Sequence, residues 1–161
     1  MNVREAFEYE PETGRLRRLK LNPGAKLYAT AVANNGYRVV WFNRKLWLEH
    51  RLVWLWHHGQ VPAMIDHRDR NKLNNRIENL RAATKSQNEY NCGPKASNKL
   101  GARGVHYNAR GSRRPFIAQI VAAGRNRYLG SFATLSEATA AYRAASLRHA
   151  GEFSPYLGGA E

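Results

Sequence analysis

Four polar residues have the types and the spacing to hydrolyse a phosphodiester bond: Asp66, His67, Asn79 and Asn88. Asp66 and Asn88 can give one divalent ion a charged and a neutral oxygen ligand, and oxygen ligands favour Mg²⁺ or Mn²⁺ over zinc. An imidazole titrates near neutrality and can take a proton from water, so His67 is the candidate general base. The amide of Asn79 both donates and accepts hydrogen bonds, which suits it to pin the loop that carries His67. We therefore expect a divalent metal site at Asp66 and Asn88, with His67 and Asn79 completing the catalytic set.

The elements around these residues are predicted to be a strand, a loop, a strand and a helix. Residues 63–65 form a short apolar run that ends at Asp66 and His67, 66–79 are polar, and 80–83 can return as a second strand. Thr84 and Gln87 stand at capping-box spacing, which would start a helix with Asn88 in its first turns. Because strand side chains alternate, His67 is expected on the opposite side from Asp66, facing the water.

The preceding residues predict two turns, a strand and a helix. Residues 8–21 indicate a hairpin with its turn at 12–14, and a second turn at 34–36 comes before a strand at 37–42. Apolar residues recur at helical spacing from Leu46 to His58, and Gly59 and Pro62 follow. We expect one amphipathic helix over residues 46–58.

The C-terminal part predicts a separate small module. Residues 93–100 are small, polar and punctuated by Gly and Pro, as in a linker. Three candidate strands follow at 104–107, 116–122 and 125–132, and a capping box at Thr134 and Glu137 starts a helix that Gly151 ends. The expected fold is α+β, with domains at 1–92 and 101–157 and a linker at 93–100. The second would be a three-stranded antiparallel sheet packed on one helix.

The composition favours a nucleic-acid partner. The 161 residues include 26 Lys and Arg against 12 Asp and Glu, a net charge of +14, which attracts polyanions. A basic protein of the membrane surface is the alternative, but no stretch reaches the roughly 18 apolar residues of a span, and the N-terminus lacks a signal-peptide core. We expect a cytoplasmic location, a monomer or weak dimer, no membrane contact and no small-molecule substrate. The single cysteine excludes a disulfide framework and a cysteine-rich zinc site.

The sequence around the four polar residues closely resembles the HNH endonucleases of the homing and phage type. The resemblance runs through residues 65–67, the segment Asn-Asn-Arg-Ile-Glu-Asn-Leu-Arg at 74–81, and residues 87–88, and it covers roughly residues 7–92. It implies a ββα-metal active site that cuts double-stranded DNA, in a phage-encoded or bacterial intracellular protein. In that site His67 is the general base, Asp66 and Asn88 hold the metal, and Asn79 is the structural Asn. Asn88 stands where other members have His, which favours Mg²⁺ over zinc.

Other polar residues of the first region are candidates for contacts with DNA. His50 could touch phosphate or the active site, or could only support the packing of its helix, and these readings stay open. Arg51 and Arg76 are the cationic candidates. The tryptophans are expected to support the core or the surface, with stacking on DNA as the less favoured use.

The second module resembles the APETALA2 (ethylene-response-factor) DNA-binding domain. The resemblance runs through residues 103–105, 116–120, 128–132 and 138–145, and covers 101 to about 153. In that family the sheet binds the major groove. Phe116 replaces the usual Trp and His106 a frequent Arg, so the site preference of plant members is not transferred. The alternative is a solvated basic face. The candidate DNA contacts of this module are Arg103, His106, Tyr107, Arg110, Phe116, Gln119, Arg125 and Arg127.

Together these features predict a metal-dependent DNA endonuclease that cuts at a preferred site held by the second module. Two alternatives remain open. One is a DNA-binding transcriptional regulator whose nuclease module is inactive, although intact Asp66, His67 and Asn88 speak against it. The other is an RNA-binding or RNA-cutting protein, because charge alone does not distinguish nucleic acids.

Overall fold

The chain divides into two compact units, which are described separately below. The computed structural model describes residues 2–20, 24, 26–28, 31–108 and 113–157. The first unit comprises residues 1–85 and the second 86–161. Residues 86–92 thus group with the second unit, whereas the sequence placed them in the first domain. The expected linker at 93–100 is partly packed, because Leu100 contacts the second core and Asn98 Nδ2 donates to the Ala102 carbonyl at 2.6 Å.

The first unit begins with a short helix and the expected hairpin. Helix α1 (Val3–Ala6) leads into β1 (Phe7–Glu10), which pairs antiparallel with β2 (Arg15–Arg18). Gly14 closes the turn at a φ of 69°, a left-handed conformation that favours glycine. The alternating pattern turns Phe7, Tyr9 and Leu16 into the core, which confirms the hairpin.

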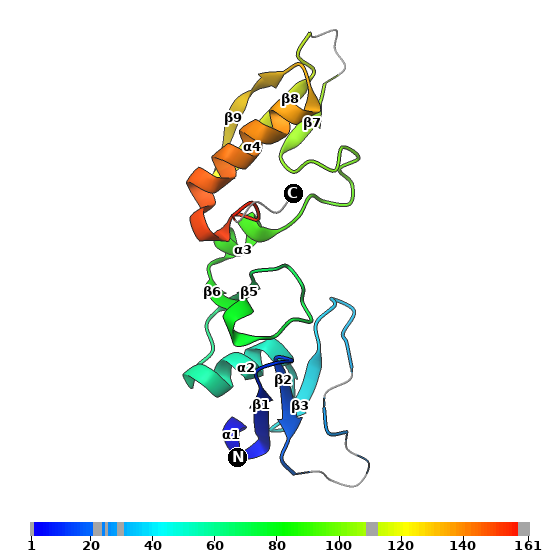
Figure 1. Ribbon diagram of the computed structural model, residues 1–161, viewed down its shortest axis with the longest axis vertical. Helices are drawn as coiled ribbons and strands as arrows, with labels where there is room; N and C mark the ends of the chain where they lie inside the picture. The colour runs from blue at the N-terminus through cyan, green and yellow to red at the C-terminus, as the bar shows by residue number, and fades with distance from the viewer. Residues whose placement is uncertain (1, 21–23, 25, 29–30, 109–112, 158–161) are drawn as a thin grey trace. The chain divides into compact units, whose positions relative to one another are not determined.

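A second hairpin precedes the helix of the first unit. Strand β3 (Val39–Phe42) pairs with β4 (Lys45–Leu48) through a turn at Asn43 and Arg44, and α2 (Glu49–His58) follows at once. The predicted helix start at residue 46 is therefore wrong, because residues 46–48 complete the strand ladder first. The predicted end is confirmed, since Gly59 takes up a left-handed conformation after His58. Figure 1 shows α2 beside β1 and β2, where Leu52 and Val53 enter the core.

The residues singled out for chemistry lie on a third strand pair. Strand β5 (Met64–His67) pairs antiparallel with β6 (Leu80–Ala83), and the segment between them ends in a 3₁₀ turn, η1 (Ile77–Asn79). Helix α3 (Lys85–Asn91) begins after β6. The order strand, loop, strand, helix is confirmed, although the first strand reaches His67.

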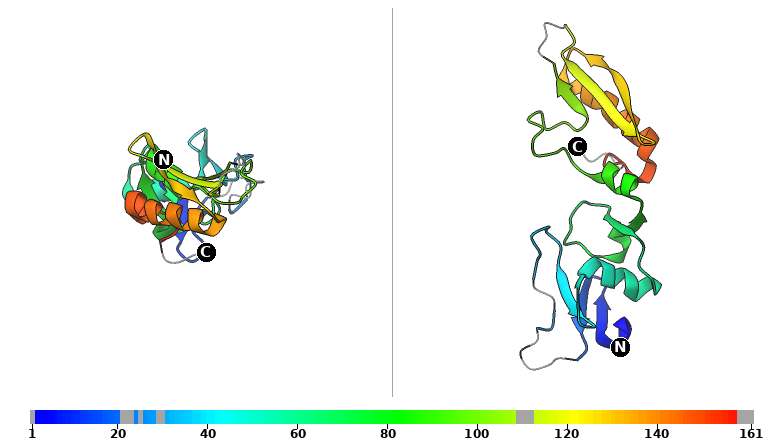
Figure 2. Two further views of the ribbon diagram at one scale, coloured as in Figure 1. Left: turned by 90° about the horizontal axis from the view of Figure 1, so that it is seen from above. Right: turned by 180° about the vertical axis from the view of Figure 1, so that it is seen from behind.

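The second unit contains α3, a three-stranded sheet and a long helix. The strands are β7 (Val105–Tyr107), β8 (Phe116–Ala122) and β9 (Arg125–Phe132), in antiparallel order β7-β8-β9. Helix α4 (Leu135–Ala150) starts at the expected Thr134–Glu137 capping box, and η2 (Gly151–Phe153) follows it. One face of α4 covers the sheet, as both side views show (Figure 1, Figure 2). The predicted sheet and helix are confirmed.

The molecule therefore mixes α and β structure in small antiparallel sheets with four α-helices among the described residues. In that part of the chain, no helix has the length and apolar character needed to cross a bilayer.

Candidate active site

Asp66 and His67 are consecutive residues at the end of β5, and both are buried. Asp66 stands opposite Arg81 in the β5–β6 ladder. The guanidinium contacts one carboxylate oxygen, Oδ2, through Nε at 2.7 Å and Nη2 at 2.6 Å. Since Arg81 is buried as well, this pair gives the carboxylate a fixed position at the end of β5.

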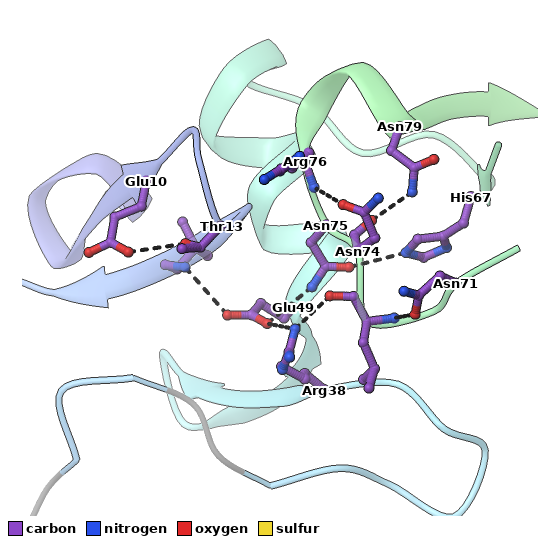
Figure 3. Close-up of polar contacts among 12 residues, drawn as sticks. Glu10, Thr13, Arg38, Glu49, His67, Asn71, Asn74, Asn75, Arg76 and Asn79 are labelled. Carbon is purple, nitrogen blue, oxygen red and sulfur yellow. Dashed lines mark hydrogen bonds and ion pairs between the residues drawn. The ribbon is translucent and has the colours of Figure 1, made fainter. Parts of the chain in front are cut away.

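His67 is held from behind by a chain of buried polar side chains (Figure 3). Its Nε2 lies 3.1 Å from the Asn75 amide oxygen, and Asn75 Nδ2 donates to Glu49 Oε2 at 3.0 Å. Glu49 also accepts from the Leu16 backbone N–H at 3.4 Å. The site histidine is thereby connected to the first residue of α2 and to strand β2.

Asn79 closes the polar loop that follows His67. Its amide oxygen accepts from the Asp69 backbone N–H at 3.0 Å, and its Nδ2 donates to Asp69 Oδ1 at 2.9 Å and to the Asn74 carbonyl at 2.8 Å. Its own carbonyl accepts from the Arg68 N–H at 2.8 Å. These contacts tie both ends of the loop together, which is the arrangement expected of a residue that pins it.

His50 lies against His67 and not at the protein surface. The ring centroids are 5.1 Å apart, and Tyr37 packs on both rings at 4.9 Å from His50 and 5.8 Å from His67. Burial, with smaller contributions from His67 and Arg51, lowers the pKa of His50 from 6.5 to about 3. His50 is thus a neutral ring of the site wall at neutral pH. Of the readings left open for it, this placement favours a role near the active site.

The pKa of His67 is also lowered, first by burial. The hydrogen bond to Asn75 and the carboxylates of Asp69 and Asp66 act in the opposite direction. The imidazole is consequently neutral at pH 7, the form that can accept a proton.

Arg51 and Arg76, both predicted to contact DNA, make contacts within the first unit. Arg51 donates to the carbonyls of Pro62 at 3.1 Å and Ala63 at 3.3 Å, which fixes the chain that enters β5. Arg76 donates through Nε to the Glu12 carbonyl at 2.7 Å, in the turn of the first hairpin. Their contact with DNA stays a prediction, and their observed contacts support the fold of the site.

The first hairpin turn presses directly on the site loop. A Cβ atom at Gly14 would lie 2.3 Å from the Arg76 nitrogen and 2.5 Å from the Asn75 carbonyl carbon, closer than packed atoms approach. The loop that carries Asn75 is therefore backed by the turn of β1 and β2.

Asn88 lies on α3, which belongs to the second unit. It is half-buried there, and its backbone carbonyl accepts from the Cys92 thiol. Its role as a metal ligand stays a prediction from the sequence.

Arg103 holds the end of α3. Its guanidinium donates to the Tyr90 carbonyl at 2.8 Å and also to the carbonyls of Glu89 and Cys92. A cation at the C-terminal carbonyls of a helix is favourable for both hydrogen bonding and the helix dipole. The structure thus gives Arg103 a structural task, and its contact with DNA stays a prediction.

The remaining candidates of the second unit do not share one face of the sheet. The face that α4 leaves uncovered, here called the open face, carries His106, Gln119, Asn126 and Tyr128. Gln119 Nε2 lies 2.6 Å from His106 Nε2 and its Oε1 accepts from Asn126 Nδ2 at 3.0 Å, while the register pairs Gln119 with Tyr128. His106, Gln119 and Asn126 thus form one hydrogen-bonded group.

The arginines of β9 lie on the other side. Arg125 and Arg127 pair with Ala122 and Ile120, which face α4, although both arginines are exposed on this edge strand. Phe116 packs against the second core, with the Tyr107 ring at 5.3 Å. The register thus puts Arg125, Arg127 and Phe116 on the side of α4, away from His106 and Gln119, and the contact of these residues with DNA stays a prediction. Arg110 lies outside the described residues.

The donor set at Asp66 suits a hard divalent cation. Among the residues that the structure describes, no group of three or more His, Cys, Asp or Glu could hold a metal ion. A single carboxylate completed by amide, water and phosphate oxygens is a common arrangement for Mg²⁺. The chemistry of Asp66 fits such an ion, whereas zinc commonly takes several His or Cys ligands.

The residues that hold the predicted ones in place were not predicted from the sequence. Arg81 could have been found from the predicted strand pair, because pairing residue 64 with residue 83 puts Arg81 opposite Asp66. Asn75 and Glu49 gave no such signal, since their contact depends on how α2 packs on the site loop.

Known proteins provide an independent comparison. A family model described as HNH endonuclease matches residues 48–90, a span that contains β5, β6 and most of α3. An uncharacterized HNH endonuclease of Acanthamoeba polyphaga mimivirus is 31% identical over 134 residues, which cover 82% of this chain and 68% of that protein. No solved structure matches the chain. The family match ends before the second module, so its APETALA2 resemblance stays a prediction. Given the relative that spans most of both proteins, the chain belongs to the HNH endonuclease family.

Proposed function

We propose that this endonuclease is a metal-dependent enzyme that hydrolyses phosphodiester bonds in double-stranded DNA, with His67 as the general base. The observation that supports it most directly is the neutral imidazole of His67, held by Asn75 at the end of β5, directly after Asp66 in the same strand. The net charge of +14 supports a polyanionic substrate.

In this proposal each residue has a separate task. His67 accepts the proton of the attacking water, and the neutral form required is the one that burial favours. Asp66 supplies a carboxylate oxygen for the cation while Arg81 fixes its position. Asn79 keeps the loop after His67 closed. Asn88 is the second proposed ligand, on the strength of the sequence pattern alone.

The proposed cation is Mg²⁺, with Mn²⁺ as the alternative, because the donors are hard oxygens. When bound, such an ion supplies positive charge that stabilises the phosphorane-like transition state and the leaving oxygen.

Nicking of a supercoiled plasmid tests the proposal. We expect cleavage with Mg²⁺ or Mn²⁺, none with a chelator, and a loss of about 10²- to 10⁴-fold in rate for His67→Ala. His58→Ala is the matched control, because His58 is an exposed histidine at the end of α2. Equal cleavage by wild type and His67→Ala would overturn the assignment.

The same assay decides between the alternatives. A folded wild-type protein that binds the plasmid but does not cut it, whichever divalent metal is added, would be a DNA-binding regulator. Parallel substrates of duplex DNA, single-stranded DNA and RNA identify the nucleic acid, and we expect the duplex to be cut fastest.

We further propose that the open face of the second unit contacts the duplex and gives a site preference, as in homing and phage enzymes. Its support is the connected group of His106, Gln119 and Asn126, since amide side chains can bond the edge of adenine. Gln119→Ala should weaken binding to the preferred duplex about 5- to 100-fold, whereas Ser136→Ala on α4 should not. Unchanged affinity and unchanged cleavage pattern in Gln119→Ala would contradict this role.

A further inference from the structure

Two polar side chains behind His67 are almost completely buried. Glu49 is 0% exposed and Asn75 is 1% exposed, although neither reaches DNA in the proposed reaction. Burying a carboxylate is unfavourable unless it is hydrogen-bonded. The arrangement therefore calls for an explanation beyond packing.

Leu16, Glu49, Asn75 and His67 form a series of hydrogen bonds, and the direction of each bond follows from the Leu16 N–H. The Leu16 backbone N–H can only donate, so Glu49 Oε1 accepts. The second oxygen of an ionised carboxylate also only accepts, so Asn75 must turn its NH₂ group toward Glu49 Oε2, as it does at 3.0 Å. Burial raises the pKa of the Glu49 carboxyl, whereas the bond from the Leu16 N–H and the positive charge of Arg38, whose Nη1 lies 4.0 Å from Oε2, favour the ionised form.

The orientation of the Asn75 amide then determines which His67 nitrogen carries hydrogen. With its NH₂ group directed at Glu49, Asn75 presents its oxygen to His67 Nε2 at 3.1 Å. An amide oxygen accepts and does not donate, so Nε2 must bear the hydrogen. In a neutral imidazole the lone pair is then on Nδ1.

We propose that Glu49 and Asn75 are positioning residues that select the tautomer of His67 with hydrogen on Nε2, so that Nδ1 is the nitrogen that accepts the proton of water. Glu49, Asn75 and His67 all belong to the first unit. The consequence for cleavage rests on the proposed function, whereas the tautomer itself does not. In a serine-protease triad, loss of the polarity of the orienting acceptor leaves the geometry intact and lowers turnover by about 10⁴-fold.

Glu49→Gln provides the sharpest test, because it changes polarity with almost no change in shape. The Leu16 N–H still requires an oxygen, so the introduced NH₂ group faces Asn75. The Asn75 amide must then turn its oxygen toward that group and its NH₂ toward His67, whose Nε2 becomes the acceptor. The hydrogen of His67 is expected to move to Nδ1, although the substituted residue does not contact the ring.

The measurement is the ¹⁵N spectrum of the full-length protein with labelled histidine, at about pH 7.5, where a free imidazole is mostly neutral. Wild type should show a protonated, pyrrole-type Nε2 and a pyridine-type Nδ1 for His67, and Glu49→Gln should show the reverse. Nicking by Glu49→Gln should fall by about 10²-fold or more while DNA affinity is unchanged. Glu78→Gln, an exposed carboxylate on η1, is the control and should match wild type in both measurements.

The double substitution Glu49→Gln with Asn75→Asp should restore the native tautomer. The introduced carboxylate at position 75 accepts both from the new amide and from His67 Nε2, so every hydrogen bond is again satisfied. We expect a protonated Nε2 and at least a tenfold recovery of nicking over Glu49→Gln, about 1.4 kcal/mol. This variant also covers the case in which Glu49→Gln alone fails to fold.

The outcomes separate the two proposals. A wild-type His67 with hydrogen on Nδ1, or the same tautomer in wild type and a folded Glu49→Gln protein, would overturn the positioning role. A wild type with the expected tautomer that cleaves nothing would leave the positioning intact and overturn the proposed function instead.

Discussion

His67 and Asp66 are adjacent in the sequence but are oriented by different parts of the first unit. Arg81, across the β5–β6 ladder, holds Asp66, and Asn75 with Glu49 holds His67. Each group of the proposed reaction thus has a buried partner of its own, which is how an enzyme keeps polar side chains in one position before substrate arrives.

Asn79→Ala should loosen the loop that follows His67. The change removes the side-chain bonds to Asp69 and to the Asn74 carbonyl, and we expect the free energy of unfolding to fall by about 1–3 kcal/mol. Urea titration measures this, and faster hydrogen exchange of the Asp69 amide would localise it. Asn71→Ala is the control, because its side chain accepts an exposed backbone bond from Leu73 in the described part of the chain. A loss as large as that of Asn79→Ala would contradict the assignment.

His50 should make the first unit sensitive to acid. Burial lowers its pKa from 6.5 to about 3, so between these values the unfolded chain binds a proton that the folded chain does not. Stability is complete above about pH 6.5 and falls as the pH drops toward 3, by about 2 kcal/mol at pH 5. Urea unfolding at pH 7 and pH 5 measures this loss of stability. Tryptophan fluorescence monitors the first unit alone, since every tryptophan precedes residue 57.

His50→Phe is the comparison for this effect. A ring that cannot be protonated should reduce the difference between pH 7 and pH 5 by the same amount. Because the pKa of His67 is lowered as well, a smaller pH dependence should remain. An undiminished dependence in His50→Phe would show that His50 is not its source.

The sequence indicated the reacting residues but not their supports. Asp66, His67 and Asn79 fall at recognisable intervals, and the structure brings them to one strand end and its loop. Glu49 and Asn75 are 26 positions apart, and their contact exists only because α2 packs on the loop. Such a long-range contact leaves no periodic signal in a single chain.

At the scale of elements, the pairing of the strands determines where α2 begins and which face of the sheet a residue occupies, and periodicity alone did not predict either. Residues 46–48 fit a helical pattern, yet they pair with residues 39–41 in a hairpin whose turn residues Asn43 and Arg44 adopt φ values of 47° and 59°. Likewise, Arg127 and Gln119 lie in neighbouring strands but on opposite faces of the sheet. Helix α4 and strands β8 and β9 were predicted closely, because a capping box and a tight turn mark their ends.

Arg103→Met tests whether this arginine serves the fold or the DNA. The substitution keeps the apolar stem but removes the donors at the end of α3, so we expect the second unit to lose about 1–3 kcal/mol of stability. Hydrogen exchange of the α3 and α4 amides measures the stability of the second unit. Arg125→Met, an exposed arginine in the β8–β9 hairpin, should change its stability by less than about 0.5 kcal/mol. Equal protection in the two variants would argue against the capping role.

At the scale of the whole molecule, the charge should govern affinity more than any single contact. With a net charge of +14, binding to a non-specific duplex should weaken by at least about tenfold between 50 and 200 mM salt, because bound counterions are released from the phosphates. Fluorescence anisotropy at several salt concentrations gives the slope. A salt-independent affinity would mean that phosphate contacts contribute little.

Gly14 shows how far the requirements of the reaction extend along the chain. Its turn carries none of the reacting groups, yet any side chain at this position would push on the backbone of Asn75 and Arg76. A genetic screen for inactive clones should therefore recover substitutions at Gly14 among those in the β5–β6 region. Such substitutions would look unrelated to catalysis in the sequence. They would act by displacing the backbone of the loop that carries Asn75.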